Sequence, residues 1–134
     1  MILVFGKTGQ VASYLANKRD VLCLSREQAD FTQPQTLMDV INHYKPKAVI
    51  NAVAYTDVDG AETNHDLALC VNAKSVKAIA SACLVAGIPL VHISSDYVFD
   101  GAGDCPKKPT DAKAPLNYYG YTCLLYTSPS PRDA

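Results

Sequence analysis

The sequence lacks any excess of one charge, because its 134 residues hold 12 Lys and Arg against 13 Asp and Glu, a net charge of −1. No basic patch or charged block stands out, which argues against a nucleic-acid partner. No apolar run approaches the length of a membrane span. The apolar stretch 1–5 is too short for a signal sequence and is followed by Gly6. We therefore expect neither a nucleic-acid nor a membrane partner.

The sequence also lacks metal-ligand spacing among its five cysteines, at positions 23, 70, 83, 105 and 123. Three of them, Cys23, Cys70 and Cys83, lie in apolar periodic segments, which is typical of small core residues in a reducing compartment. We therefore expect a cytoplasmic protein with no metal site. The composition, 49% hydrophobic and 19% charged, is that of an ordinary globular domain with a real core.

Short apolar runs alternate with segments of helical periodicity along the chain. Strands are predicted at 2–5, 20–24, 48–54 and 88–93, with helices after residue 10, after residue 32 and over about 67–86. This alternation predicts an α/β fold, a Rossmann-like doubly wound parallel sheet in three α/β/α layers. A loop rich in Gly, Pro, Asp and Lys is predicted over 101–117, before a further helix.

Two of the predicted helices have apolar faces. Thr32 is a fair N-cap, and Pro34 lies near the first turn of the helix that Pro46 stops. The apolar face of that helix comprises Leu37, Val40, Ile41 and Tyr44. The longer helix is predicted to stop at Gly87. Its predicted buried stripe consists of Leu69, Ala73, Val76, Ala80 and Cys83.

Two glycines follow the first strand at once. Gly6 is predicted to make the tight turn, and Gly9 to let the backbone approach a pyrophosphate at the start of the next helix. Ala12, at the third position of this fingerprint, is small enough for helix and sheet to pack closely. A plain turn between strand and helix is the alternative interpretation.

The second strand ends in Ser25 and Arg26. Dinucleotide-binding folds that prefer NAD often place an acid here, whereas an Arg suits the 2′-phosphate of NADP. The sequence therefore favours NADPH over NADH. Small residues end the third strand, up to Ala54, and they let a flat ring lie against the backbone, so this edge is a predicted contact for adenosine and ribose.

The stretch 91–100 starts apolar and turns polar at residues 94–96, which is typical of a buried parallel strand that opens onto a site. Ligands bind outside the carboxyl ends of strands in open α/β sheets. A hydroxyl there can hold a substrate oxygen, and Tyr119 lies downstream as a possible proton donor. His92 is predicted to be a satisfied core or interface histidine rather than a catalyst. Asn72 needs no catalytic role, since its side chain can bond to backbone.

Four segments occur in order along the chain, at 5–11 (FGKTGQV), 51–59 (NAVAYTDVD), 94–99 (SSDYVF) and 114–120 (APLNYYG). Together they resemble the dTDP-4-dehydrorhamnose reductase family, a branch of the extended short-chain dehydrogenases/reductases, over nearly all of residues 1–122. The resemblance implies reduction of the 4-keto group of a dTDP-4-keto-6-deoxy sugar with NADPH (or NADH), giving dTDP-rhamnose. It also implies a homodimeric parent protein.

The resemblance implies roles for residues that match the family's motifs. Ser95 stands where the family usually has Thr and keeps the hydroxyl that polarises the keto oxygen. Asp96 matches a substrate contact, and Tyr119 matches the catalytic tyrosine. The predicted cofactor-binding residues combine those that match the family's motifs with Ser25 and Arg26, which end the second strand. They are Gly6, Gly9, Gln10, Val11, Ser25, Arg26, Asp30, Phe31, Ala54, Tyr55 and Thr56.

The chain departs from the family at the fourth position after Tyr119, where Cys123 replaces the expected lysine. Residues at i and i+4 share one helix face, and an ammonium there would lower the pKa of a phenol from its usual value of about 10. The family's lysine also holds the nicotinamide ribose. A neutral thiol can do neither.

The C-terminal stretch 123–134 resembles a translated sequencing adapter, and its Ser-Pro-Ser-Pro breaks a helix. We therefore expect an incomplete NAD(P)-binding Rossmann domain over 1–122, a non-native tail over 123–134 and an absent substrate lobe. A truncated sheet is expected to leave an edge and apolar faces uncovered. This exact chain is expected to be poorly stable and inactive.

Two other functions stay open on the sequence. One is another extended reductase or epimerase acting on a nucleotide sugar, since substrate choice depends mainly on the absent lobe. The other is a non-catalytic subunit that binds the cofactor and a partner enzyme, of the kind that regulates methionine adenosyltransferase. Lysine at the fourth position after Tyr119 in the complete reading frame would favour an enzyme, and its absence a binding subunit.

Overall fold

The computed structural model describes residues 1–103, 106–108 and 111–127. Four parallel strands form the sheet in the order β2-β1-β3-β4. Their bounds are β1 Ile2–Phe5, β2 Val21–Leu24, β3 Ala48–Asn51 and β4 Leu90–His92. All four lie where strands were predicted, so the parallel α/β sheet is confirmed. Placing β1 between β2 and β3 requires crossovers in both directions, which is the doubly wound arrangement.

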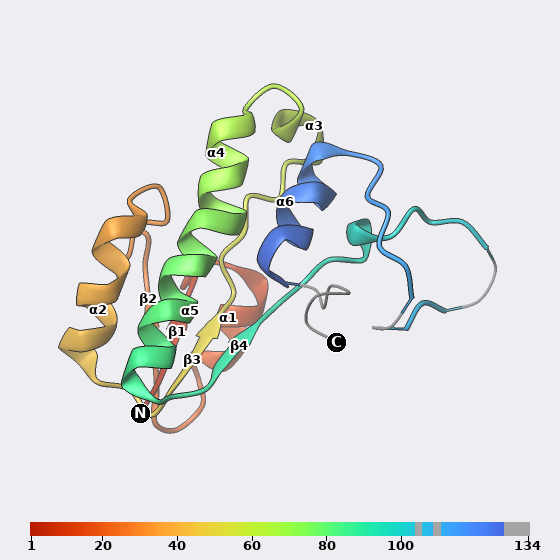
Figure 1. Ribbon diagram of the computed structural model, residues 1–134. Coiled ribbons are helices and arrows are strands. Elements are labelled where there is room, and N and C mark those ends of the chain that lie inside the picture. The colour runs from red at the N-terminus through yellow and green to blue at the C-terminus, as the bar shows by residue number, and fades with distance from the viewer. Residues whose placement is uncertain (104–105, 109–110, 128–134) are drawn as a thin grey trace.

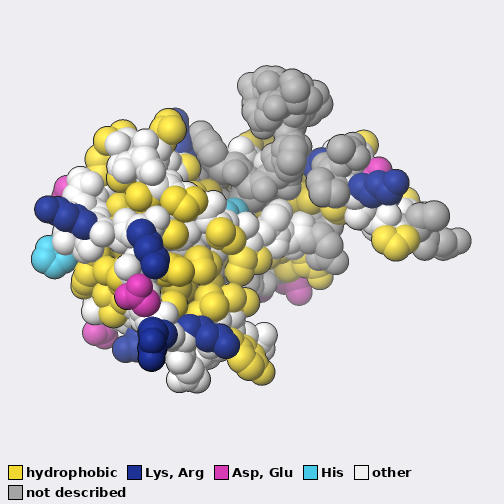
Figure 2. Space-filling model, turned by 90° about the horizontal axis from the view of Figure 1, so that it is seen from below, with side chains coloured by type: hydrophobic (Ala, Val, Ile, Leu, Met, Phe, Trp, Pro, Cys, Tyr) yellow, Lys and Arg dark blue, Asp and Glu magenta, His cyan; other side chains and the backbone are white. Residues whose placement is uncertain are grey.

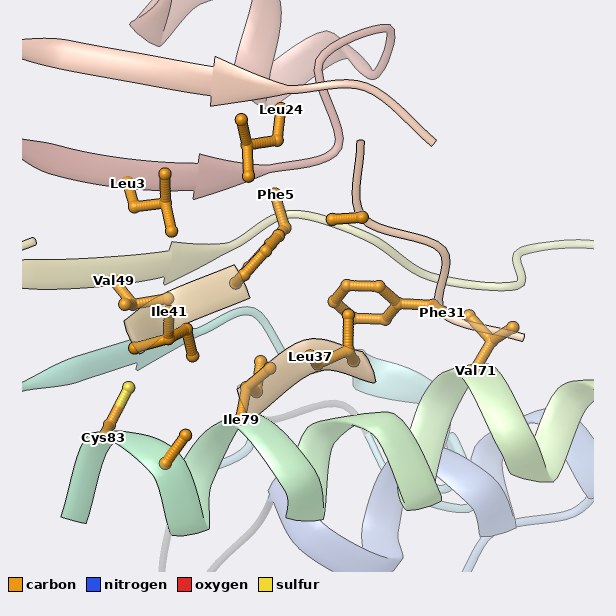
Figure 3. Close-up of a cluster of buried hydrophobic side chains, with 12 residues drawn as sticks. Leu3, Phe5, Leu24, Phe31, Leu37, Ile41, Val49, Val71, Ile79 and Cys83 are labelled. Atoms are coloured by element: carbon orange, nitrogen blue, oxygen red, sulfur yellow. The ribbon is translucent and has the colours of Figure 1, made fainter. Parts of the chain in front are cut away.

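Helices cover both faces of the sheet (Figure 1). On one face, α2 (Leu37–Tyr44) and α5 (Ser75–Ala86) pack over the apolar side chains of β1, β2 and β3. On the other, α1 (Gln10–Leu15) buries Ala12 against Val4 and Cys23. Figure 3 shows the larger cluster, with Phe5, Leu3 and Leu24 from the strands facing Ile41 and Ile79 from the helices. These two apolar layers confirm the three-layer prediction.

The third strand ends earlier than predicted, at Asn51 rather than at residue 54. The Asn51 side chain explains this, because its Oδ1 accepts a hydrogen bond from the backbone N–H of Val53 at 3.0 Å. Such a local turn withdraws the backbone from the ladder. The small residues from Ala52 to Ala54 therefore lie in the loop after β3 instead of in the strand.

The second helix begins later than predicted. A 3₁₀ turn, η1 (Pro34–Thr36), precedes α2, and Thr32 is not its N-cap. The Asp30 carboxylate accepts hydrogen bonds from the backbone N–H of Thr32 at 2.9 Å and from its hydroxyl at 2.7 Å. Thr32 is therefore engaged in a local turn. At the other end, Lys45 closes the helix in a left-handed conformation, with φ 48°.

The long helix predicted over 67–86 is present but is not a uniform α-helix. It consists of α4 (His65–Leu69), a π-helical turn η2 (Cys70–Lys74) and α5, and Gly87 ends it with φ 69°. A π turn carries an extra residue, which rotates the buried face. The predicted stripe is therefore wrong at Leu69 and Ala80, which are only partly buried. The buried members are Ala68, Val71, Asn72, Ala73, Ser75, Val76, Ile79, Ala82 and Cys83.

This helical stretch, His65–Ala86, has the length and the apolar composition of a membrane span, contrary to the expectation that no segment would reach them. Half of its most apolar window is buried inside the fold. The buried side packs against the sheet and α2, as in the core helix of a globular domain.

The rest of the described chain lies beside the carboxyl ends of the strands. It comprises α3 (Val58–Ala61), the 3₁₀ turn η3 (Asp96–Val98) and α6 (Tyr118–Thr127). Asn117 caps α6, because its Oδ1 accepts a hydrogen bond from the N–H of Gly120 at 2.8 Å. The described part of 101–117 contains no helix or strand, as predicted.

Apolar side chains remain exposed at the edge of the sheet. β4 is an edge strand, and Val91 is 57% exposed. Leu84 and Val85 project from the end of α5 with about four fifths of their surface exposed. Figure 2 shows hydrophobic side chains gathered over the middle of the lower face, bordered by charged ones. Uncovered apolar surface was the expectation for this sheet.

Candidate functional site

The turn after β1 depends on Gly6. Its φ of +102° is rarely adopted by residues with a Cβ. A Cβ at this position would also lie 3.0 Å from the backbone carbon and oxygen of Ala52. Gly9 follows as the N-cap of α1, and its N–H donates to the Gly6 carbonyl at 2.8 Å. A Cβ at Gly9 would lie 3.3 Å from that carbonyl oxygen. The backbone is therefore tightly folded at these two glycines, and both line a cavity.

A cavity of about 390 Å³ lies outside the carboxyl ends of β1, β2 and β3. It takes in both glycines of the turn, the loop after β3, and side chains from η2 and from the segment after β2. Its lining residues are Gly6, Lys7, Thr8, Gly9, Arg26, Ala29, Asp30, Phe31, Thr32, Ala52, Val53, Ala54, Tyr55, Leu67 and Val71.

Seven of the predicted cofactor-binding residues line this cavity, and four do not. The seven are Gly6, Gly9, Arg26, Asp30, Phe31, Ala54 and Tyr55; the four are Gln10, Val11, Ser25 and Thr56. Gln10 and Val11 begin α1, directly after the lining residue Gly9. Val11 is 45% exposed.

Ser25 does not line the cavity, and its polar groups are engaged within its own turn. Its backbone N–H and its hydroxyl both donate to Oε1 of Gln28, at 3.0 and 3.2 Å. The carbonyl of Ser25 accepts from the N–H groups of Gln28 and Ala29. The segment after β2 is thus a closed turn, and within it Arg26 and Ala29 line the cavity.

Asp30 is held as a carboxylate on the cavity wall. The hydrogen bonds from the hydroxyl and N–H of Thr32 lower its pKa, and the nearby Arg26 guanidinium adds to the effect. Beside it, the Phe31 ring packs edge-on against Phe5, with centroids 5.4 Å apart (Figure 3). The lining therefore combines one anion, Asp30, with two cations, Lys7 and Arg26, beside the apolar ring of Phe31.

Tyr119, on α6, lies outside this cavity and is buried, with 8% of its surface exposed. Burial raises the pKa of its phenol, and a hydrogen bond with Ser95 lowers that pKa in part. The Ser95 Oγ also accepts a hydrogen bond from the N–H of Tyr97 at 3.2 Å. The structure therefore brings Ser95 and Tyr119 together, as the predicted pair requires. The side chain of Asp96 lies outside the described part of the structure.

Cys123 lies on the same face of α6 as Tyr119, one turn later. Its side chain is buried, and that burial raises the pKa of its thiol. A hydrogen bond joins it to Tyr119. A neutral thiol therefore occupies the place beside the phenol where the family resemblance expects an ammonium.

Asn72 joins the cavity to the Tyr119 side of the molecule. From the π turn, its Oδ1 accepts from the N–H of Tyr55 at 2.9 Å and its Nδ2 donates to the Tyr55 carbonyl at 3.1 Å. The same Nδ2 donates to Oγ1 of Thr122 at 3.1 Å, and that hydroxyl donates to the Tyr119 carbonyl at 2.7 Å. The backbone bonds match the prediction for Asn72. The bond to Thr122 was not foreseen, because it joins residues 50 positions apart.

His92 is a satisfied histidine, as predicted. Its Nδ1 lies 2.9 Å from Nδ2 of Asn51, the residue that ends β3. Since an amide nitrogen can only donate, Nδ1 is the acceptor and the ring proton is on Nε2. Burial lowers the pKa of His92. Among the described residues, no cluster of three or more His, Cys, Asp or Glu side chains could hold a metal ion.

The parallel sheet, the glycine turn and the cavity at the strand ends define a Rossmann fold of the dinucleotide-binding type. The family described as RmlD substrate binding domain matches residues 1–126. The chain therefore belongs to that family.

Named relatives agree with the family match. The chain is 44% identical over 131 residues to the dTDP-4-dehydrorhamnose reductase of Salmonella typhimurium, covering 92% of this chain and 44% of the relative. It is 42% identical over 132 residues to that of Mycobacterium tuberculosis, covering 92% and 43%. The chain thus spans less than half the length of these relatives.

Solved structures give the same fold. A dTDP-4-dehydrorhamnose reductase from Clostridium acetobutylicum superimposes with a TM-score of 0.86 at 34% identity, over 92% of this chain and 46% of that one. A reductase of the same name from Bacillus anthracis, solved in complex with NADP, gives a TM-score of 0.83 at 31% identity with the same coverage.

Proposed function

We propose that this chain is the cofactor-binding part of an NADPH-dependent dTDP-4-dehydrorhamnose reductase, acting on the 4-keto group of a dTDP-4-keto-6-deoxy sugar to give dTDP-rhamnose. The observation that supports this most is the Ser95–Tyr119 pair, which lies beside a glycine-turn cavity in a member of the RmlD family. NADH is the alternative cofactor, and a homodimeric, cytoplasmic parent protein is part of the proposal.

The cavity suits a dinucleotide because the glycine turn lines it directly before α1. Gly6 lets the main chain turn closely against Ala52, and a diphosphate would bind at the start of the helix that follows this turn. Arg26 would meet the 2′-phosphate of the adenosine ribose. The remaining contacts would come from the lining residues Gly9, Asp30, Phe31, Ala54 and Tyr55. The roles proposed for Gln10, Val11, Ser25 and Thr56 rest on the family resemblance and on their place in the sequence. When bound, NADPH supplies the hydride that reduces the carbonyl carbon.

Ser95 and Tyr119 would handle the proton at the keto oxygen. The Ser95 Oγ accepts the N–H of Tyr97, and its hydroxyl is hydrogen-bonded to Tyr119, so a substrate oxygen would replace that bond to receive the Ser95 proton. Tyr119 would give its phenolic proton to the developing alkoxide. Burial keeps that phenol protonated near neutral pH, since it raises the phenol pKa. Asp96 would contact the sugar.

Cys123 makes this chain a poor catalyst in the proposal. No ammonium stands one turn after Tyr119, and the thiol there is buried with a raised pKa. Losing such acid–base tuning typically costs a hundredfold or more in rate, about 10² to 10⁴. We propose that residues 1–122 are an incomplete Rossmann domain and that 123–134 are not native sequence. An independent genomic read whose codons continue through 123–134 would contradict this.

A second candidate, a subunit that binds the cofactor without turnover, fits the thiol if Cys123 is native sequence. A third candidate, another nucleotide-sugar reductase or epimerase, differs in the part of the protein that chooses the sugar. The complete reading frame separates the candidates: lysine at the fourth position after Tyr119 supports a reductase, and any residue without an ammonium supports the binding subunit.

Binding and turnover are tested separately on the purified 134-residue chain. NADPH fluorescence is titrated with wild type, and we expect saturable binding that Tyr119→Phe and Ser95→Ala leave unchanged. Oxidation of NADPH by a dTDP-4-keto-6-deoxy sugar is then followed by absorbance, and we expect none above background. Absence of NADPH binding would contradict the cofactor proposal, and measurable turnover would contradict the role given to the missing lysine.

A further inference from the structure

Tyr97 occupies the middle of the turn η3 and contacts both members of the proposed catalytic pair. Its ring packs edge-on against the Tyr119 ring, with centroids 5.6 Å apart and planes at 86°. Its backbone N–H donates to the Ser95 Oγ at 3.2 Å. One residue therefore touches the phenol through its side chain and the serine hydroxyl through its backbone.

The backbone of Tyr97 also packs against the first turn of α6. Gly120 packs directly on the carbonyl oxygen of Tyr97, and a Cβ at position 120 would collide with that oxygen. The same Cβ would lie 3.0 Å from the Pro115 side chain. Since Gly120 follows Tyr119 in the helix, this contact sets how far the Tyr119 backbone lies from η3.

Tyr97 is 47% exposed, so it is not a core-filling residue. Its ring nevertheless packs against the buried Tyr119. Tyr97 is not among the residues that line the dinucleotide cavity. Its contacts therefore concern the phenol and the serine hydroxyl, and not the cofactor-binding wall.

We propose that Tyr97 is the positioning residue of this site: its ring holds the plane of the Tyr119 phenol, and its N–H aims the Ser95 hydroxyl. This inference rests on the proposed roles of Ser95 and Tyr119. An edge-to-face ring contact has a preferred geometry, so it restricts ring rotation more than an aliphatic side chain of similar volume would. Because Tyr97 keeps water from one side of Tyr119, it also helps to keep the phenol protonated.

The test is the titration of Tyr119 in the full chain, labelled with ¹³Cζ-tyrosine and followed by NMR as the pH rises. Tyr119→Phe assigns the resonance. Besides the Ser95 hydroxyl, the groups that act on this phenol are the Cys123 thiol and the Tyr97 phenol. The variants are Tyr97→Phe, which keeps the ring, and Tyr97→Leu, which removes it. Tyr14→Leu is the matched control, because Tyr14 is 81% exposed on α1.

We expect the Tyr119 pKa to stay raised in Tyr97→Phe and Tyr14→Leu, and to fall toward about 10 in Tyr97→Leu. An unchanged titration in Tyr97→Leu would overturn the proposal. So would an equal fall in Tyr97→Phe, because that would assign the effect to the Tyr97 hydroxyl instead of its ring. If Tyr97→Leu loses its circular dichroism signal, Tyr97→Met is used for the same comparison.

NADPH binding by the same variants distinguishes the proposal for Tyr97 from the proposal that the chain binds the cofactor. Tyr97→Leu is expected to bind NADPH as wild type does, since Tyr97 does not line the cavity. Failure of wild type to bind NADPH would contradict the cofactor proposal and leave the Tyr119 titration interpretable. A shifted titration with unchanged cofactor binding is the result that supports a positioning role.

Discussion

The carboxyl ends of β1, β2 and β3 and the region around α6 are built in different ways. At the strand ends, the cavity is lined by segments that directly follow neighbouring strands: the glycine turn after β1, the loop after β3 and the turn after β2. Around α6, the arrangement depends on side chains that reach one another across the fold, among them Ser95, Tyr97 and Tyr119.

This difference indicates which function, cofactor binding or catalysis, we expect this chain to retain, although it spans less than half the length of its relatives. The residues that line the cavity lie at the ends of β1, β2 and β3 and in α4 and η2, all within the described chain. The proposed mechanism uses an ammonium beside Tyr119, and this chain has a buried thiol there. We therefore expect cofactor binding to be retained and chemistry to be lost.

The largest effect is expected from breaking the link between the two regions at Asn72. Asn72→Leu removes both bonds to the part-buried backbone N–H and carbonyl of Tyr55, and it removes the bond to the Thr122 hydroxyl, which keeps its bond to Tyr119. Each unpaired buried group costs about 1–3 kcal/mol, so the free energy of unfolding should fall by about 3 kcal/mol. Urea denaturation measures it. Asn42→Leu, on the exposed side of α2, is the control, and a loss below about 1 kcal/mol at Asn72 would contradict the network.

Next in size is the effect of filling the glycine turn. Gly6→Ala is expected to cost about 2 kcal/mol or more of stability and to abolish NADPH binding, because positive φ and crowding against Ala52 act together. Gly87→Ala is the matched control, since Gly87 also has positive φ but nothing lies within 4 Å of its added Cβ. If Gly6→Ala binds NADPH as tightly as Gly87→Ala does, the glycine turn does not hold the diphosphate.

A smaller effect on cofactor binding is expected from replacing Arg26, which lines the cavity. Arg26→Gln should weaken NADPH binding about tenfold, or about 1.4 kcal/mol, and leave NADH binding unchanged, because only NADPH has the 2′-phosphate. Calorimetric titration with both cofactors measures this difference. Arg19→Gln, at an exposed position, serves as the control. Equal losses for the two cofactors would contradict the assignment of Arg26.

The smallest effect is expected from pH acting on His92. Burial lowers its pKa in the folded chain, so below about 6.5 the unfolded chain binds more protons than the folded one. The free energy of unfolding should therefore fall as pH drops from about 6.5 to the folded pKa. Protonation of Nδ1 also breaks the contact with Asn51. Urea denaturation between pH 7 and pH 5 should show this slope, and His92→Gln should reduce it; an unchanged slope would contradict the role of burial.

The sequence predicted the parts of the fold that depend on near neighbours. The strand, glycine turn and helix at 2–15 is one such part, since each step follows from adjacent residues. The start of α2 was wrong because the Asp30 carboxylate competes for Thr32. The end of β3 was wrong because Asn51 binds the N–H of Val53. Both are side-chain bonds to local backbone, which periodicity does not reveal.

The candidate site was predictable where a motif marks it and not where distant residues meet. Ser95 and Tyr119 were paired from the order of motifs along the chain. The predicted buried stripe of the long helix was right at Ala73, Val76 and Cys83 and wrong at Leu69 and Ala80, and it missed the π turn in which Asn72 bonds to Tyr55 and Thr122. The contact between Tyr97 and Tyr119 likewise depends on how η3 and α6 pack.

The central claim is that the ends of β1, β2 and β3 bind a dinucleotide. Its most direct test is NADPH titrated into the ¹⁵N-labelled chain, with amide shifts followed residue by residue. The account predicts saturable shifts at Gly6, Gly9, Phe31 and Tyr55, and none at Leu84. Shifts confined to other residues, or none at all, would contradict it.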